Sequence, residues 1–467
     1  MVNRISPLHW LLLSAGLLTA CASPTAMQPA ARPLDASVYG QDATAVPDAA
    51  TQGAWWRALH IAELDQLIDD ARRQHPSLTE ALARIRAATA SVRLTAAGAG
   101  PQIDANAGTE RARESEYGLL PPPIGGSWYS LHALSVDMGW RLDLWGRIRS
   151  QTASAEARRL AARLEYQASE QWLASAITAQ YLELAGSRLQ ADAARQELDL
   201  ARQQARQAAS LLRSGLVTAD VPDSLHADQL ALESRITQLQ AREQTAAHAL
   251  AALSAQPQDR IDRLQARQLP DWSFDSATLT TRALAARPDV QAALAYVRAS
   301  EHSVDAAKAA FYPDLTLGAF IGLQAQNTAD LFSRAGSIAG IMPGISLPLF
   351  HAGALNAELD AQSAGRDTAI ARYNQTLLTA IREAADGVSQ TQAARQLWQQ
   401  AQSRHATLAQ LARRSQSRIR SGLAAPMQAL ADARQSSAAW QQHLAAQTST
   451  LLAQTALMRA LAVPAPL

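Results

Sequence analysis

Few side chains in this sequence are placed to do chemistry. The only cysteine among 467 residues is Cys21, a thiol at the end of an N-terminal apolar stretch. The 10 histidines lack the spacing of metal ligands, and the sequence has no Gly-x-Ser-x-Gly, His-Glu-x-x-His or phosphate-loop motif. We therefore expect no enzyme, no metal site and no bound cofactor, and Cys21 is left as the one reactive group.

Cys21 ends a segment typical of a secretory signal peptide. Arg4 supplies a positive charge, and the mainly apolar residues 10–18 are too few to remain as a membrane-spanning helix. The Leu-Thr-Ala-Cys ending, residues 18–21, resembles the lipobox of bacterial lipoproteins. That resemblance implies cleavage before Cys21, a lipid on its sulfur and an acylated amino group, and Ala22 implies the outer membrane. The alternative is an ordinary cleavage site with a stray cysteine.

The composition favours long helices and excludes some partners. Alanine, glutamine, leucine and arginine dominate, while aromatic residues make up 5% and charged residues 18% of the chain. The formal net charge of +1 gives no electrostatic basis for binding nucleic acid. A chain with one cysteine cannot form an intrachain disulfide.

Four stretches alternate between apolar and polar residues, which is typical of strands with one apolar face: 103–109, 134–144, 315–323 and 341–349. Strands of ~10 residues can cross a bilayer at a tilt. Four strands cannot close a barrel, because the smallest membrane barrels need about eight. If these strands lie in the membrane, several chains must share one barrel. The alternative is a soluble antiparallel sheet.

Two long stretches without proline, 150–213 and 354–419, predict helices on the order of 100 Å long at ~1.5 Å per residue. Each is followed by the same tetrapeptide and then by a proline, Pro222 or Pro426, which is tolerated in the first turn of a returning helix. The sequence therefore predicts two antiparallel helical hairpins. The repeated turn residues are Arg213, Ser214, Gly215 and Leu216, and Arg420, Ser421, Gly422 and Leu423.

The same order of strands, long helix, turn and returning helix occurs twice, so we infer an internal duplication. The expected organisation is a signal peptide (1–20), a lipidated linker (21–54), a first repeat (55–255), an equatorial belt segment (256–279), a second repeat (280–463) and a C-terminal tail (464–467). Both repeats are expected to contain a helix, two strands and a long helical hairpin.

Six segments in order resemble the TolC-type outer membrane factors, and within them the lipoprotein branch of multidrug and fusaric-acid efflux systems. They are Trp55-Trp56, LDLWGRIR (142–149), ARPDVQAAL (286–294), AAFYPDLTLGAFIGL (309–323), PGISLPLF (343–350) and ARYNQTLLTAIREAADGV (371–388). The resemblance implies an α+β membrane protein: an antiparallel helical coiled-coil barrel joined to a twelve-strand β-barrel shared by a homotrimer. It also implies a periplasmic adaptor and an inner-membrane transporter as partners.

The expected function is a passive exit duct for drugs and other small toxic compounds across the periplasm and the outer membrane. One alternative is a type I secretion duct with the same kind of tunnel. Another is an envelope-spanning scaffold lipoprotein that transports nothing. The sequence leaves the substrate and the class of transporter open.

The resemblance also implies a gate, because carboxylates in the family ring the periplasmic tip after the repeated turns. Three copies of one carboxylate around an axis form a cation-selective ring. The candidates are Asp220, Asp223 and Asp432, together with Gln428, which is not a carboxylate but lies at a position that can be acidic in relatives. Asp432 fits the family's spacing only with a one-residue insertion in the turn. The alternative for each aspartate is a solvated residue favoured by the helix dipole. We further expect the two turns to contact the adaptor.

Overall fold

The computed structural model describes residues 28–30, 32–34, 54–118, 125–272, 284–423 and 425–461. Cys21 and the predicted signal peptide lie outside these residues. The chain divides into two units, and we describe each by itself. Unit 1 comprises Met1–Pro33, Arg84–Ala162 and Ala293–Tyr373, and unit 2 comprises Leu34–Ala83, Arg163–Ala292 and Asn374–Leu467.

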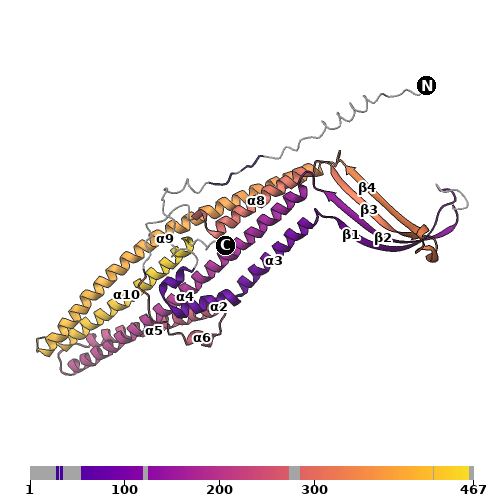
Figure 1. Ribbon diagram of the computed structural model, residues 1–467. Helices are drawn as coiled ribbons and strands as arrows, with labels where there is room; N and C mark the ends of the chain where they lie inside the picture. Colours follow the sequence, from indigo (N-terminus) through magenta and orange to yellow (C-terminus); the bar gives the residue numbers. More distant parts are fainter. Residues whose placement is uncertain are drawn as a thin grey trace. The chain divides into compact units, whose positions relative to one another are not determined.

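Unit 1 contains one antiparallel sheet with the strand order β1-β2-β3-β4 (Figure 1). Its strands are β1 (Gln102–Arg113), β2 (Trp128–Leu142), β3 (Asp314–Ala325) and β4 (Ser337–Ser346). All four expected strands are confirmed. The expected end of β4 at residue 349 is wrong, since the strand stops at Ser346; two residues on, Pro348 has no N–H to donate to a ladder.

The expected continuation of the second strand to residue 144 is also wrong, because Asp143 is used to start the next helix. Its carboxylate accepts hydrogen bonds from the backbone N–H groups of Ile148, at 2.9 Å, and Arg149, at 2.8 Å. A carboxylate there satisfies free donors of the first turn and complements the helix dipole. The polar residue that ends the alternating pattern of β2 is therefore the one that begins helix α4.

The strand register gathers the apolar residues on one face of the sheet. Val136 of β2 lies opposite Ile321 of β3, which lies opposite Ala339 of β4. On the other face, the Asp137 carboxylate accepts hydrogen bonds from Asn106, at 2.8 Å, and from Ser135, at 2.6 Å. The alternation expected from the sequence thus becomes one apolar face and one mixed face, on which Phe320 and Met342 accompany the polar residues.

Most of the other described residues lie in helices: η3 (Trp55–Leu59), α2 (Ala62–Gln74), α3 (Pro76–Ala97), α4 (Arg147–Arg213), α5 (Asp220–Ser254), α6 (Gln258–Asp262), α8 (Pro288–Ala309), α9 (Ala354–Arg420) and α10 (Pro426–Leu461). The expected hairpins are α4–α5 and α9–α10. The first helix of each has 67 residues, and the second has 35 in α5 and 36 in α10. Among the described residues, no helix has both the length and the apolar character needed to cross a membrane.

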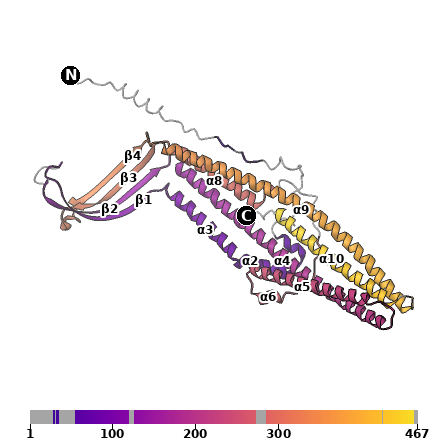
Figure 2. The ribbon, with the colours of Figure 1, turned by 180° about the vertical axis from the view of Figure 1, so that it is seen from behind.

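The hairpin turns lie side by side at one end of unit 2 in both views (Figures 1 and 2). The core of this unit lies away from the turns. There, Trp55 and Leu64 pack with the buried stripe Leu173, Ile177 and Tyr181 of α4. These three residues are spaced four apart, as on the apolar face of an amphipathic helix.

Helices α4 and α10 approach each other closely at Gly186. A Cβ on this residue would overlap the side chain of Thr448 and would lie 3.1 Å from the Thr448 Cβ itself, so rotating the threonine would not relieve the clash. The Thr448 hydroxyl also donates a hydrogen bond to the carbonyl of Leu444, at 2.8 Å. Gly186, the only glycine in α4, is therefore the residue that allows α10 to pack against α4.

Replacing Gly186 with alanine should lower the midpoint of thermal unfolding. The overpacking cost of about 1–3 kcal/mol exceeds the gain of roughly 1 kcal/mol from removing a helix glycine. Gly365 in α9 is the matched control, because a Cβ there meets no atom within 4 Å. Gly365→Ala should leave the midpoint unchanged or raise it, and an equal drop in both variants would contradict this account.

Candidate functional site: an exposed apolar sheet and two helical turns

The apolar face of the sheet is exposed over several large side chains. Ile321 is 66% and Ile341 is 75% exposed, and Ile345 is similarly open. A contiguous apolar surface of this kind marks contact with lipid or protein. The outer edges of β1 and β4 are not paired with another strand among the described residues. A sheet that lies in hydrocarbon cannot leave its edges open, so within a membrane further strands would have to pair with β1 and β4.

Aromatic side chains flank the sheet at both ends of the strands. At one end, Trp145 stacks on Tyr312 with 5.1 Å between ring centroids, and its indole N–H donates to the carbonyl of Pro313 at 2.7 Å. At the other end, the guanidinium of Arg111 lies 5.9 Å from the centre of the Trp128 ring. Belts of aromatic residues at both rims are typical of membrane β-barrels.

The two repeated turns, residues 213–216 and 420–423, have the same backbone conformation. Gly215 has a φ of 68° and Gly422 a φ of 70°, in the left-handed region that favours glycine. A Cβ on either glycine would meet no atom within 4 Å, so the backbone angle alone requires glycine here.

The residue after each glycine closes the turn. The N–H of Leu216 donates to the carbonyl of Leu211 at 2.9 Å, and the N–H of Leu423 donates to the carbonyl of Arg418 at 2.8 Å. A hydrogen bond from a backbone N–H to the carbonyl five residues earlier is characteristic of the Schellman motif at the C-terminus of a helix. The side chains of Leu216 and Leu423 are 69% and 77% exposed. Each hairpin therefore presents one apolar side chain at its tip.

The four gate candidates fall into two groups. Asp220 and Asp223 are exposed in the first turn of α5. Asp432 is only 5% exposed, and its carboxylate accepts hydrogen bonds from the hydroxyl of Ser415 in α9 and from the amide of Gln428, the latter at 3.0 Å. Among the described residues, no hydrogen bond or ion pair joins these two groups. Asp432 can line a pore only if its bonds within the α9–α10 hairpin are broken.

Arg434 is a functional candidate that the sequence did not reveal. Its guanidinium donates to Gln204 of α4 at 2.8 Å and to Asp228 of α5 at 2.9 Å, so it links α10 to both helices of the other hairpin. Further along α10, the amide of Gln441 donates to the buried carboxylate of Glu197 at 2.5 Å. Burial raises the pKa of Glu197, although Arg434 and the bond from Gln441 act in the opposite direction.

These residues follow a seven-residue spacing in α10, as in a coiled-coil seam. The seam positions are Arg434, Gln441, Thr448 and Thr455 on one side and Ser437, Leu444, Leu451 and Met458 on the other. A search for apolar periodicity misses this seam, because five of its eight positions are polar. The seven-residue spacing of these positions is the feature of the sequence that could have indicated the seam.

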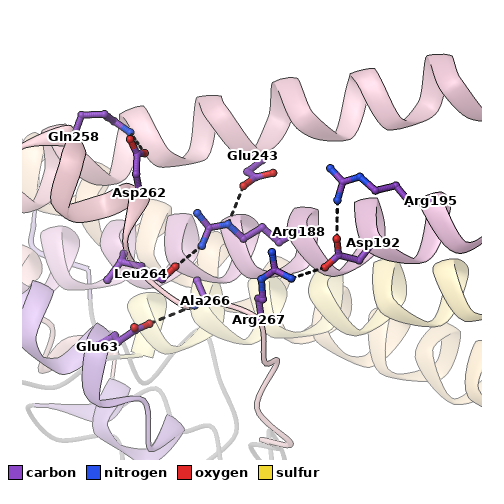
Figure 3. Close-up of polar contacts among 10 residues, drawn as sticks. All are labelled: Glu63, Arg188, Asp192, Arg195, Glu243, Gln258, Asp262, Leu264, Ala266 and Arg267. Carbon is purple, nitrogen blue, oxygen red and sulfur yellow. Dashed lines mark hydrogen bonds and ion pairs between the residues drawn. The ribbon is translucent and has the colours of Figure 1, made fainter.

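Belt residues that the structure describes are held against the helices by backbone hydrogen bonds (Figure 3). The Glu63 carboxylate accepts the N–H of Gln265 at 3.0 Å and of Ala266 at 3.4 Å, and also the hydroxyl of Tyr181 at 2.8 Å. Burial would raise the pKa of Glu63, but these bonds outweigh it and lower the pKa.

Two arginines complete the attachment of the belt in Figure 3. Arg188 of α4 donates to Glu243 of α5 at 2.8 Å and to the carbonyl of Leu264 at 2.6 Å. Arg267 pairs with Asp192 of α4 at 2.9 Å. Residues 273–279 of the expected belt lie outside the described residues, and its role as a separate domain stays a prediction.

In the described part of the chain, no group of three or more histidine, cysteine, aspartate or glutamate residues is placed to hold a metal ion.

Comparison with known proteins gives concordant results. A family model described as "Outer membrane efflux protein" matches residues 67–256 and 279–463. Multidrug resistance outer membrane protein MdtQ of Escherichia coli O157:H7 is 32% identical over 380 residues, which cover 75% of this chain and 76% of that protein. Multidrug resistance outer membrane protein MdtP of Escherichia coli (strain K12) is 32% identical over 344 residues, covering 72% and 70%.

A solved structure agrees with the described architecture. The crystal structure of the outer membrane protein VceC from Vibrio cholerae matches with a TM-score of 0.78 and 27% identity. The match covers 88% of this chain and 99% of that chain. The sheet and the helical hairpins are therefore shared with a protein of the outer membrane.

Proposed function

The chain belongs to the outer membrane efflux protein family, so it is an efflux channel of the outer membrane, and we propose that three copies of it form the exit duct of a tripartite drug pump. In this assembly a periplasmic adaptor and an inner-membrane transporter supply the substrate and the energy. The duct itself carries drugs and other small toxic compounds passively.

The observation that carries the proposal is the exposed apolar sheet with two open edges. Four strands are half of what the smallest membrane barrel needs. Pairing β1 of one chain with β4 of the next removes every open edge, and three chains then give a twelve-strand barrel. The equal lengths of α4 and α9 support an internal duplication, in which each half contributes two strands and one hairpin.

The hairpin tips are the proposed contact with the adaptor. Both turns have one geometry and expose one leucine each, Leu216 and Leu423, so a partner can recognise the two in the same way. The links of Arg434 between the hairpins support a second part of the proposal, in which separating the hairpins opens the periplasmic end. Asp220 and Asp223 then contribute a carboxylate ring at that end.

The proposal includes a lipid on Cys21, which supports attachment to the outer membrane in addition to the barrel. Cys21→Ser should lose all incorporation of a labelled fatty acid, because the thiol is the acceptor of the lipid. Labelled cells analysed by gel electrophoresis would measure this. Equal labelling of the wild type and the Cys21→Ser chain would contradict lipidation at this residue.

Export measured in cells tests the proposed function. A strain lacking the gene should retain more of a fluorescent dye or antibiotic that such pumps remove, and a plasmid copy should restore export. Unchanged retention of every compound in a panel of such substrates would contradict the proposal. The alternatives have separate outcomes: loss of a secreted protein with normal drug export indicates a secretion duct, and loss of neither indicates a scaffold.

A further inference from the structure

Four aromatic side chains meet where α9 and α10 pack against each other. Trp398 and His405 come from α9, and Trp440 and His443 come from α10. The ring of Trp440 lies 4.9 Å from that of His405 and 5.0 Å from that of His443, measured between centroids. Trp398 lies 6.2 Å from His443. We call these four residues the His–Trp cluster.

The surroundings of both imidazoles in this cluster favour the neutral form over the protonated form. His443 is 8% exposed, and its buried Nδ1 has no hydrogen-bond partner among the described residues. No carboxylate in the described part of the chain forms an ion pair with either histidine. The two histidine rings are 6.2 Å apart, so a charge on one acts directly on the other.

The charged groups near the cluster come from α9 and α4. Arg413 of α9 acts electrostatically on His405 and opposes its protonation. Arg404, beside His405, donates to Gln442 of α10 at 2.7 Å. On α4, which packs against another side of α10, Glu197 is already bonded to Gln441. Stacking on an indole favours a cation, but burial of both rings and the charge of Arg413 on His405 prevail.

We propose that the His–Trp cluster is an acid-sensitive contact, which packs α9 against α10 when both imidazoles are neutral and loosens the hairpin when they are protonated. The hairpin also carries the second tip turn and Asp432, so loosening it would ease the opening of the periplasmic end. That consequence rests on the proposed function, whereas the change in packing does not.

The pH range follows from the direction of the shifts. Burial first, and then Arg413, lower the pKa of His405; burial first, and then His405, lower the pKa of His443. An imidazole with a lowered pKa in the folded protein does not change the free energy of unfolding at pH values above its ordinary pKa of about 6.5, because it is neutral in both states. As the pH falls below about 6.5, the unfolded chain binds the proton first and the free energy of unfolding decreases. The decrease is complete below the folded-state pKa.

Amide hydrogen exchange of the purified full-length protein tests this, compared at about pH 5 and about pH 8 after correction for intrinsic rates. In the wild type, opening of residues 398–420 and 426–443 should increase several-fold at the lower pH. The α4–α5 hairpin should change less, because neither histidine of the cluster lies on it, which makes it an internal control. Equal changes in the two hairpins would overturn the proposal without any variant being made.

Variants locate the effect. A chain with both His405→Gln and His443→Gln should lose the acid response of the α9–α10 hairpin, and His226→Gln should keep it, because His226 is an exposed histidine on α5. An acid response that persists in the double variant would overturn the assignment to these residues. Because exchange is measured on the isolated protein, its outcome is independent of whether cells export drugs.

Discussion

A chain carrying Gly215→Val and Gly422→Val should reach the outer membrane as a trimer and should export nothing. Both glycines have positive φ values that a β-branched residue adopts only at a cost of about 1–3 kcal/mol each. The backbone of both turns should therefore rearrange and move Leu216 and Leu423 away from the hairpin tips. Both changes lie beyond the last residues of the 67-residue helices, and the sheet is remote from them in sequence, so assembly should survive.

Drug retention and trimer abundance would be measured in the same cells. Gly353→Val is the matched control, because Gly353 has a φ of 84° and open space around it but precedes α9 instead of following it. That variant carries the same backbone penalty without altering a tip. Normal export by the double-valine chain would show that the turns do not contact a partner, and loss of trimers would show that they act in assembly.

The second large effect is expected at Arg434. Arg434→Ala should make the outer membrane leaky to antibiotics that are too large for ordinary pores, because it removes the bonds from α10 to both Gln204 and Asp228. The Arg434 side chain is only 15% exposed, so its removal also leaves polar partners unpaired, at about 1–3 kcal/mol. The closed arrangement of the hairpins should then be less stable than the open one.

Single-channel conductance in planar bilayers would measure this, with antibiotic susceptibility as the cellular reading. Arg202→Ala is the control: Arg202 pairs with Glu233 at 3.1 Å, but that pair joins α4 and α5 within one hairpin and is half exposed. Exposed pairs contribute little. Equal conductance of the Arg434 and Arg202 variants would contradict a role for the link between hairpins.

The regular elements were predictable because their signals are local. Alternation marked each of the four strands, and the register then aligned Val136 with Ile321 as a two-residue period requires. Absence of proline marked α4 and α9, and Pro426 occupies the first position of α10. Two predicted strand ends were wrong by a few residues, because Asp143 starts helix α4 and because Pro348 has no N–H to donate to a ladder.

The contacts at the hairpin ends were not predictable, because they join segments far apart in the sequence. Nothing near Arg434 indicates that Gln204 and Asp228 are its partners, and nothing near Asp432 indicates that the hydroxyl of Ser415 binds it. The backbone bonds from the belt to Glu63 have no sequence signal of any kind. Such placements depend on how the helices pack, which local patterns do not encode.

The migration of the protein on a gel, before and after boiling, tests the central claim most directly. Extracted from purified outer membranes, it should run at the size of three chains and collapse to one chain on boiling, since shared strand pairing closes the barrel. A single chain that runs alike in both lanes, recovered from the soluble or inner-membrane fraction, would contradict a barrel shared between chains.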